Sequence, residues 1–154
     1  MILKNFRINA FTSRKLLGNP ACVVPLKKWL SDEILLKIAK KNNVSETAFF
    51  INENSKFSIR WFTPDIEMDL CGHATLAAAH CINKHLNLNF ETILFNSNIG
   101  KLSVNILNDL YQLDFPKREP IESELPEEIY NSLSIKPDKV LKSRDYVLVY
   151  NNID

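Results

Sequence analysis

One segment, residues 75–86, limits the folds open to this chain more than any other. It is rich in alanine and nearly apolar around its whole circumference when it is read at the helical period. A helix on a protein surface has a single apolar stripe, whereas a helix that is apolar all round is buried. The segment therefore predicts a central helix that other elements enclose on most sides.

Apolar residues on both sides of that helix recur with the alternation of strands. We expect strands at residues 2–10, 21–26, 48–51, 57–62, 92–96, 102–107 and 110–115. A helix that packs on the sheet is expected after Ser31, its N-cap, with Ile34, Leu35 and Ile38 on one face. The simplest assembly is an α+β fold in which a mostly antiparallel sheet curls around the central buried helix.

The chain divides by composition near residue 115. Residues 1–115 hold the strands and the apolar helix, and are expected to form one domain. Residues 116–154 begin with a connector rich in proline and glutamate, followed by a short helix near 127–133 and an apolar strand at 146–150. That strand pairs back into the sheet or begins a second domain that this chain lacks, and we expect the second case.

Charge and cysteine content exclude several classes of protein. The net charge of +1 comes from 19 basic and 18 acidic residues, so the chain shows no electrostatic signature of binding to nucleic acid or to an anionic membrane. Cys22, Cys71 and Cys81 form no CxxC pair and leave one thiol over in any disulfide scheme. Without a signal peptide at the start or an apolar run of about 20 residues, the chain is expected to be cytoplasmic.

The first candidate for chemistry is Glu46, within Ser45-Glu46-Thr47-Ala48-Phe49. Here a carboxylate enters an apolar strand directly after a helix. Loss of hydration would suit this group to accept and return a proton. A solvated loop glutamate is the alternative interpretation.

The second candidate is the segment around Cys71, Gly72 and His73, which leads into the apolar helix. Backbone N–H groups without partners gather at a helix N-terminus, where they can hold a substrate carboxylate. Cys71 could act as a base or be a small buried hydrophobic residue. His73 could position a substrate, relay a proton, or serve only to cap the helix.

Metal binding by the histidines is not expected. His73 and His80 are two helical turns apart, about 10 Å, which is too far for them to share one ion. His80 and His85 are expected on different faces, as structural or exposed residues.

Several motifs in a fixed order resemble the N-terminal half of PhzF-like proteins of the phenazine biosynthesis family. They are Asn9-Ala10-Phe11-Thr12, Gly18-Asn19-Pro20-Ala21-Cys22-Val23-Val24, Ser45-Glu46-Thr47-Ala48-Phe49, Arg60-Trp61-Phe62-Thr63-Pro64 and Cys71-Gly72-His73-Ala74-Thr75. The match is clear from residue 2 to about residue 79, and the strands up to Phe115 are compatible with it. Motifs that occur together in order are more specific than any one of them alone.

The resemblance implies the diaminopimelate epimerase fold, in which two similar domains enclose the active site. It implies that Glu46 is the catalytic acid/base, that His73 lies in the same site, and that Asn19, Ser45, Gly72 and His73 contact the substrate. The implied reaction is an isomerisation in which a proton shifts between carbons of a small carboxylate, with neither a metal nor an organic cofactor.

Two departures from the family leave alternatives open. Cys71 stands where PhzF itself has another residue, although diaminopimelate epimerases have cysteine there, so Cys71 is a catalytic second base or a relic. Family members are close to twice this length and carry a DPVTG-type segment that this chain lacks. The chain is therefore expected to be truncated and inactive alone, completed by a separate C-terminal half or by a second copy. The alternative is a non-catalytic module that self-associates or binds a protein partner.

Overall fold

The computed structural model describes residues 2–12, 18–53, 56–108 and 110–152. The chain forms two compact units, Met1–Pro116 and Lys117–Asp154. The first unit contains the larger of the two sheets, and the second contains the smaller. That the second unit begins an absent domain stays a prediction.

The first unit is built on one sheet whose strands run in the order β1-β2-β3-β4-β6-β7-β8, with β5 paired to β4. Its strands are β1 (Phe6–Ala10), β2 (Asn19–Leu26), β3 (Glu46–Glu53), β4 (Lys56–Phe62), β5 (Glu67–Met68), β6 (Thr92–Ser97), β7 (Gly100–Leu107) and β8 (Leu110–Asp114). The pairs β2–β3 and β4–β6 are parallel, and the other pairs are antiparallel.

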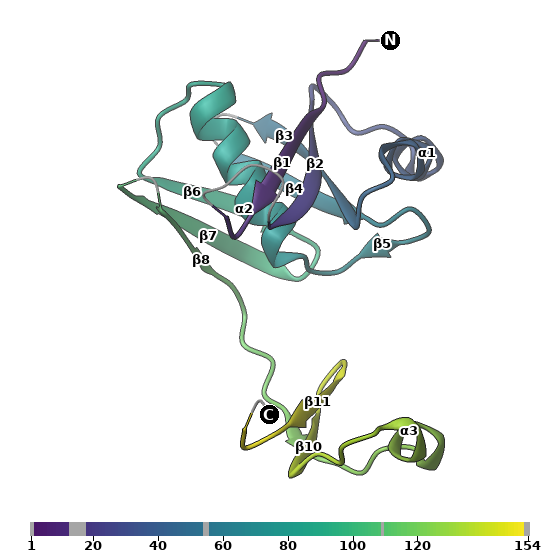
Figure 1. The fold of residues 1–154 in the computed structure, drawn as a ribbon. Helices are drawn as coiled ribbons and strands as arrows, with labels where there is room; N and C mark the ends of the chain where they lie inside the picture. Colours follow the sequence, from purple (N-terminus) through teal and green to yellow (C-terminus); the bar gives the residue numbers. More distant parts are fainter. Residues whose placement is uncertain (1, 13–17, 54–55, 109, 153–154) are drawn as a thin grey trace. The chain divides into compact units, whose positions relative to one another are not determined.

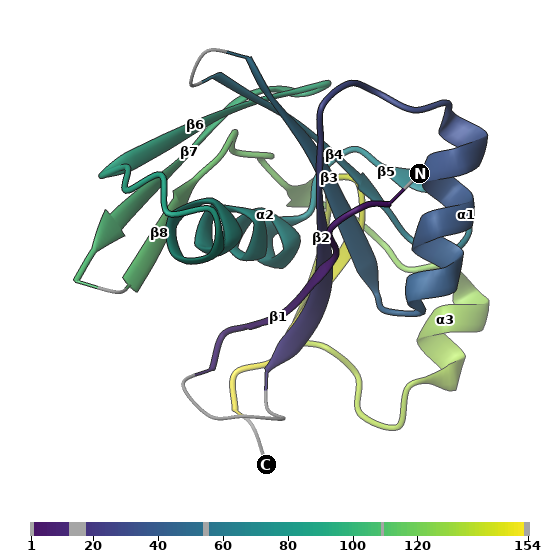
Figure 2. The ribbon, with the colours of Figure 1, turned by 90° about the horizontal axis from the view of Figure 1, so that it is seen from above.

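The sheet curls around helix α2 (Gly72–His80), which lies on its concave side (Figures 1 and 2). Within α2, alanine dominates the buried positions, among them Ala74, Ala77, Ala78 and Ala79. Small side chains let the strands approach the helix on several sides at once. The predicted α+β class, a mostly antiparallel sheet curled about a central buried helix, is confirmed.

The middle of the sheet is buried on both faces. Along β3, Ala48 and Phe50 face the core around α2, whereas Phe49 and Ile51 face a second apolar cluster. Leu35 of helix α1 (Asp32–Asn42) belongs to that second cluster. Because side chains alternate along a strand, a strand this apolar must be covered on both sides, and α2 and α1 supply the two covers.

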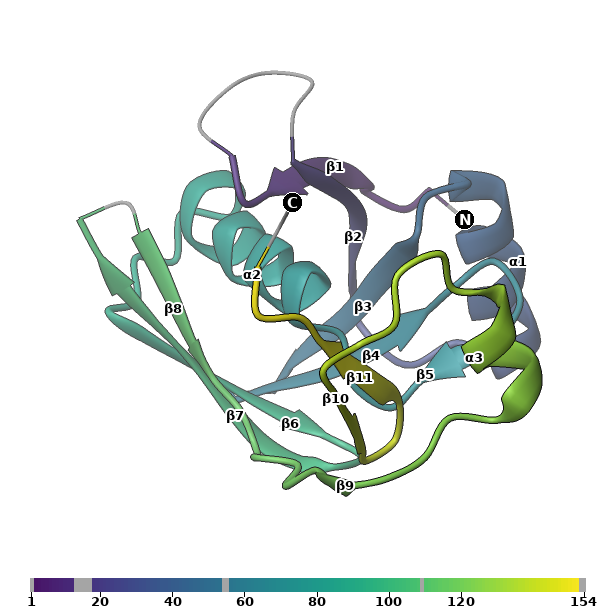
Figure 3. The same ribbon diagram turned by 60° about the horizontal axis from the view of Figure 1, so that its bottom comes forward.

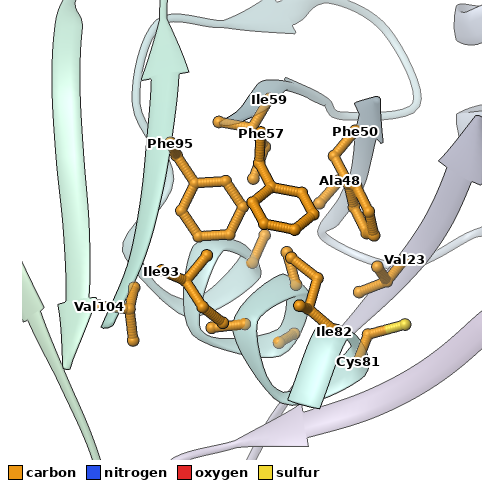
Figure 4. Packing of buried hydrophobic residues seen from close by; sticks show 14 of the residues in the cluster. Val23, Ala48, Phe50, Phe57, Ile59, Cys81, Ile82, Ile93, Phe95 and Val104 are labelled. Carbon is orange, nitrogen blue, oxygen red and sulfur yellow. The ribbon is translucent and has the colours of Figure 1, made fainter. Parts of the chain in front are cut away.

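Large side chains fill the space between α2 and the strands (Figure 4). Phe57 of β4 and Phe95 of β6 are each at most 1% exposed, and their ring centroids lie 5.9 Å apart. Ile82 reaches the same cluster from the segment that follows α2. Complete burial of side chains of this size stabilises the fold by about 1.5–3 kcal/mol each.

The central helix differs from its prediction at both ends. It begins at Gly72, three residues before residue 75, and after His80 it continues as a π-helix, η1 (Cys81–His85). The wider π-turn brings residues five apart onto one side. The His80 and His85 rings consequently meet edge to face at 5.6 Å, so the prediction that they lie on different faces was wrong. Phe6 stacks on His85 at 5.0 Å.

Helix α1 lies close to where the sequence placed it. Ser31 occupies the N-cap position, although its side chain makes no capping hydrogen bond. Leu35 and Ala39 are buried against the sheet, while Ile34 is 42% exposed. The buried face of α1 therefore does not include all three of the predicted apolar positions.

The second unit is a small three-stranded sheet with one short helix (Figure 3). Its elements are β9 (Ile121–Glu122), α3 (Glu127–Ser132), β10 (Lys139–Lys142) and β11 (Tyr146–Val149), with β10 between β11 and β9. The terminal strand thus pairs antiparallel with β10 and not with the large sheet. None of residues 117–152 is buried.

Among the residues that the structure describes, no helix is long and apolar enough to cross a membrane.

Candidate active site

Three chain segments meet where strands β2 and β3 begin. Because β2 and β3 are parallel, with Ala21 opposite Glu46, both strands begin at the same end of the sheet. Asn19 opens β2, and Ser45 directly precedes Glu46 at the start of β3. The N-terminus of α2 reaches the same place, because His73 contacts both Ser45 and Glu46. The topology thus brings together residues that the sequence separates by up to 54 positions.

His73 is the centre of the cluster. Its Nε2 atom lies 3.3 Å from Glu46 Oε2 and 3.4 Å from Ser45 Oγ. Its other ring nitrogen, Nδ1, lies 3.4 Å from Cys71 Sγ. The side chain is only 9% exposed, so each ring nitrogen must find its partner within the protein.

Ser45 connects the histidine to strand β2. Its Oγ lies 3.2 Å from Asn19 Oδ1 and 3.3 Å from the Pro20 carbonyl oxygen, both of which can only accept a hydrogen bond. The hydroxyl proton therefore points toward β2. The oxygen keeps its lone pairs for a proton from His73 Nε2.

Burial raises the pKa of the Cys71 thiol to about 12, and the nearby Glu46 carboxylate adds to the rise, while the Ala74 backbone amide opposes it. A thiol with this pKa is protonated at neutral pH, so its S–H can donate to His73 Nδ1. The tautomer that satisfies every contact carries its proton on Nε2. We assign this tautomer from the hydrogen-bond network.

Glu46 points inward and is only 17% exposed in its side chain. Its Oε2 atom is buried and has no hydrogen-bond partner, even though His73 Nε2 lies within ion-pair distance. The 3.3 Å contact therefore lacks the geometry of a hydrogen bond. The alternative of a solvated loop glutamate does not describe this side chain.

Gly72 is the first residue of α2, next to Cys71 at the N-cap. A Cβ atom built on it would contact only Leu113 Cδ2, at 3.7 Å. Amides at this position are the part of a helix that can receive an anion.

All six residues predicted from the sequence lie at or next to the start of β2 and β3: Asn19, Ser45, Glu46, Cys71, Gly72 and His73. The structure adds the Pro20 carbonyl, which accepts from Ser45. No side-chain pattern could have revealed it, because the group belongs to the backbone. The functional roles of the six residues stay predictions.

The remaining helix histidine belongs to another place. His80 Nδ1 lies 3.1 Å from the Tyr111 hydroxyl. Both residues line a cavity of about 620 Å³ between β1, α2 and β8. None of the six site residues lines that cavity, so its lining does not overlap with the cluster around His73.

Comparison with known proteins establishes the family. The model of the phenazine biosynthesis-like protein family, PhzC-PhzF, matches residues 8–143. The chain belongs to this family. The resemblance drawn from the sequence motifs is confirmed.

Curated relatives agree with this assignment. The chain is 41% identical over 152 residues to an uncharacterised isomerase of Pseudomonas aeruginosa, covering 99% of this chain and 59% of that protein. A second uncharacterised isomerase of the same organism is 44% identical, with 97% and 57% covered. The chain thus spans a little under three fifths of the length of these relatives.

Solved structures share the fold. A PhzF family protein of Enterococcus faecalis superposes with a TM-score of 0.86 at 38% identity, covering 99% of this chain and 58% of that one. A PhzC/PhzF protein of Clostridium difficile gives 0.82 at 39% identity, with 97% and 58% covered. A predicted epimerase of Pseudomonas aeruginosa, at 18% identity and a TM-score of 0.71, supports the fold alone.

Proposed function

We propose that this chain carries one half of the active site of a cofactor-independent isomerase that moves a proton on a small carboxylate, with Glu46 as the acid/base. One observation carries the proposal most directly. The Oε2 atom of Glu46 is buried beside His73 and uses none of its lone pairs in a hydrogen bond. A carboxylate oxygen held in this way is available to take a proton from a substrate.

The reaction would run in two steps. Glu46 removes a proton from a carbon next to an electron-withdrawing group, and the electron pair of the C–H bond moves into that group. Glu46 then returns the proton to another carbon, or to the other face, and the carboxylate is regenerated. The α2 N-terminus at Gly72 and His73 would hold the substrate carboxylate and oppose the negative charge that develops.

The neighbours of Glu46 would position the reacting groups. With its proton on Nε2, His73 presents an N–H toward Ser45 beside the Glu46 carboxylate, while the Cys71 S–H occupies Nδ1. Because burial raises the pKa of Cys71 to about 12, the thiol fixes the histidine tautomer and does not act as a second base. This choice between the two roles of Cys71 is part of the proposal.

The site would be completed by residues that the relatives carry beyond the matched part. The chain covers 57–59% of the two Pseudomonas isomerases, and residues from the remainder would close the site over the substrate. We therefore expect the 154-residue chain to be inactive alone. A cytoplasmic location and the absence of nucleic-acid and membrane partners belong to the same proposal.

Deuterium exchange tests the role of Glu46. The chain, with and without the C-terminal part of a relative supplied as a separate polypeptide, is incubated with candidate carboxylates in deuterated water. Uptake into the substrate carbon is expected only in the complemented sample, and Glu46→Gln should slow it by about 10²-fold or more. Glu53→Gln, at the exposed end of the same strand, is the matched control. An unchanged rate in the Glu46→Gln variant contradicts the assignment.

A second candidate function is self-association without catalysis. Phe11, just after edge strand β1, and Leu110, at the start of edge strand β8, are each 73% exposed. Exposed apolar side chains at unpaired sheet edges favour association. Light scattering on a size-exclusion column decides this point, because a monomer at all concentrations contradicts it and a stable dimer supports it.

A further inference from the structure

Three side chains of different donor chemistry converge at the candidate active site. Glu46 offers a carboxylate oxygen, Cys71 a sulfur and His73 a ring nitrogen, and one such atom from each lies within 4.8 Å of the others. Cys71 and His73 are buried, and Glu46 is partly buried. This combination differs from the pair of histidines, His73 and His80, whose spacing along the helix rules out a shared ion. We propose that these three residues bind one borderline-soft divalent metal ion, Zn²⁺, which occupies the site in competition with substrate.

The donor set fits this ion better than it fits a hard cation. Zn²⁺ takes sulfur, nitrogen and carboxylate oxygen together in a tetrahedral arrangement, whereas Mg²⁺ and Ca²⁺ prefer oxygen alone. Three protein ligands leave the fourth position to water. Because Glu46 is 17% exposed in its side chain, water and the ion can reach the cluster from this side.

The distances come close to those of a tetrahedral site. Zn–S and Zn–N bonds of about 2.3 and 2.0 Å place sulfur and nitrogen roughly 3.5 Å apart. Cys71 Sγ and His73 Nδ1 already lie 3.4 Å apart. The Glu46 carboxylate must shift to complete the set, since its printed contact with the ring is to Nε2, at 3.3 Å, and not to Nδ1. Its Oε2 atom gives up no hydrogen bond in doing so.

The surroundings of His73 support Nδ1 as the ligand atom. A histidine that binds a metal usually donates its other ring N–H to a fixed oxygen, which orients the ring. Ser45 Oγ lies 3.4 Å from Nε2 and is itself held by Asn19 and the Pro20 carbonyl. The outer support that a metal-bound histidine requires is therefore already present.

The charges balance when the ion binds. The Cys71 thiol loses its proton to solvent and becomes a thiolate, so two negative ligands and one neutral imidazole neutralise Zn²⁺. An ion bound in this way occupies Glu46, and inhibition of turnover follows if Glu46 is the acid/base. Inhibition thus rests on the proposed function, whereas binding of the ion does not.

Cobalt spectroscopy tests the binding without any turnover. Co²⁺ added to the full chain should produce the visible absorption of a tetrahedral site and a near-ultraviolet thiolate-to-cobalt band, and both should saturate at one equivalent of Co²⁺. Addition of Zn²⁺ should abolish both absorptions. Cys71→Ala should remove the near-ultraviolet band. The matched control is Cys81→Ala, which removes a buried thiol that is not one of the three proposed metal ligands. This variant should keep the near-ultraviolet band.

Competition with a chromophoric chelator measures Zn²⁺ affinity in the same proteins. Glu46→Gln and His73→Gln should each weaken binding by at least about tenfold, and far-ultraviolet circular dichroism verifies that the variants fold. The metal site is refuted if the unaltered chain shows no thiolate band or if the band survives in Cys71→Ala. It is also refuted if Glu46→Gln binds Zn²⁺ as tightly as the unaltered chain. Failure of deuterium exchange to depend on Glu46 refutes the proposed function instead and leaves these binding results unchanged.

Discussion

Each of the three cysteine side chains is buried. Burial raises the pKa of the Cys71 and Cys81 thiols to about 12 and that of the Cys22 thiol above its ordinary value. Because the thiolate is the reactive species, we expect none of the three to react rapidly with Ellman's reagent at pH 8 in the folded protein. All three should react after unfolding in urea. A fast-reacting thiol that disappears in Cys71→Ala would contradict the protonated state assigned to that residue.

The raised pKa values of these thiols predict that the folded protein loses stability at alkaline pH. In the unfolded chain they titrate near 9.0, while in the folded chain Cys71 and Cys81 titrate near 12. Between these values the unfolded state holds fewer protons than the folded state, so stability that is fully present below pH 9 falls as pH rises. Urea unfolding at several pH values measures the slope. In Cys81→Ala the slope should be shallower, and an unchanged slope contradicts the prediction.

Arg60 ties three elements of the first unit together. Its guanidinium donates to both carboxylate oxygens of Glu67 in β5, at 2.7 and 2.6 Å, and to Asp32 of α1 at 2.8 Å. It also lies over the rings of Trp29 and Phe62. The Glu67 hydrogen bonds raise the pKa of the guanidinium, which is the largest of the influences upon it.

Replacement of Arg60 by lysine should lower the free energy of unfolding by about 1–2 kcal/mol. Lysine keeps the charge but cannot form the paired hydrogen bonds or stack its head group as a plane. Urea unfolding monitored by circular dichroism measures the change. Asp32→Asn is the control, because that carboxylate is 76% exposed and an exposed ion pair contributes at most about 1 kcal/mol. Equal effects of the two substitutions would count against this prediction.

At the scale of elements, two glycines with positive φ stand at strand ends in different surroundings. Gly18 has φ of +85° before β2, and a Cβ there would lie 2.2 Å from the Ala10 carbonyl oxygen. Gly100 has φ of +120° at the β6–β7 turn, and a Cβ there would meet nothing within 4 Å. The first position combines backbone strain with a clash, and the second has strain alone.

Alanine substitution separates these two effects. Gly100→Ala should lower the free energy of unfolding by about 1–2 kcal/mol, the usual cost of a strained backbone conformation. Gly18→Ala should cost at least about 1 kcal/mol more, because the Ala10 oxygen belongs to the backbone of a paired strand and cannot move away cheaply. Urea unfolding of both variants measures the difference. A smaller loss for Gly18→Ala shows that the edge strand β1 yields easily.

Sequence periodicity was sufficient for elements whose own side chains reveal their surroundings. The Ala-rich run around Ala77 predicted a buried helix because no face of it is polar, and the strands of the large sheet followed from their alternation. Periodicity could not reveal the π-turn at Cys81–His85, since an apolar run continues through a π-turn as it does through an α-helix. The two-residue strands β5 and β9 were also missed, because so short a segment carries no period.

The candidate site was predictable in its residues but not in its geometry. Glu46, Cys71 and His73 stand in motifs that mark them as a group, and the structure brings them together. Which ring nitrogen of His73 meets which partner depends on the register of β3 beside β2 and on the first turn of α2. Such tertiary relations leave no trace in the spacing of residues along the chain.

At the scale of the whole molecule, the two units differ in how they are stabilised. Both apolar clusters belong to the first unit, one with buried residues from β2 to β7 and the other with buried residues of β2, α1, β3 and β4. In the second unit none of residues 117–152 is buried, and Ile121, Ile135 and Val147 are exposed. A unit of this size without a core is marginal at best by itself. The stability of the chain should therefore reside in its first 116 residues.

Hydrogen exchange measures this difference directly in the full chain. Amides of β3 and β4, which lie inside the large sheet, should exchange only through global unfolding, whereas amides of β10 and β11 should exchange orders of magnitude faster through local opening. A chain ending at Pro116 should keep its melting temperature within a few degrees, because none of the removed residues that the structure describes is buried. Slow exchange in β10, or a large fall in melting temperature on truncation, would show that the second unit is held by a core of its own or stabilises the first.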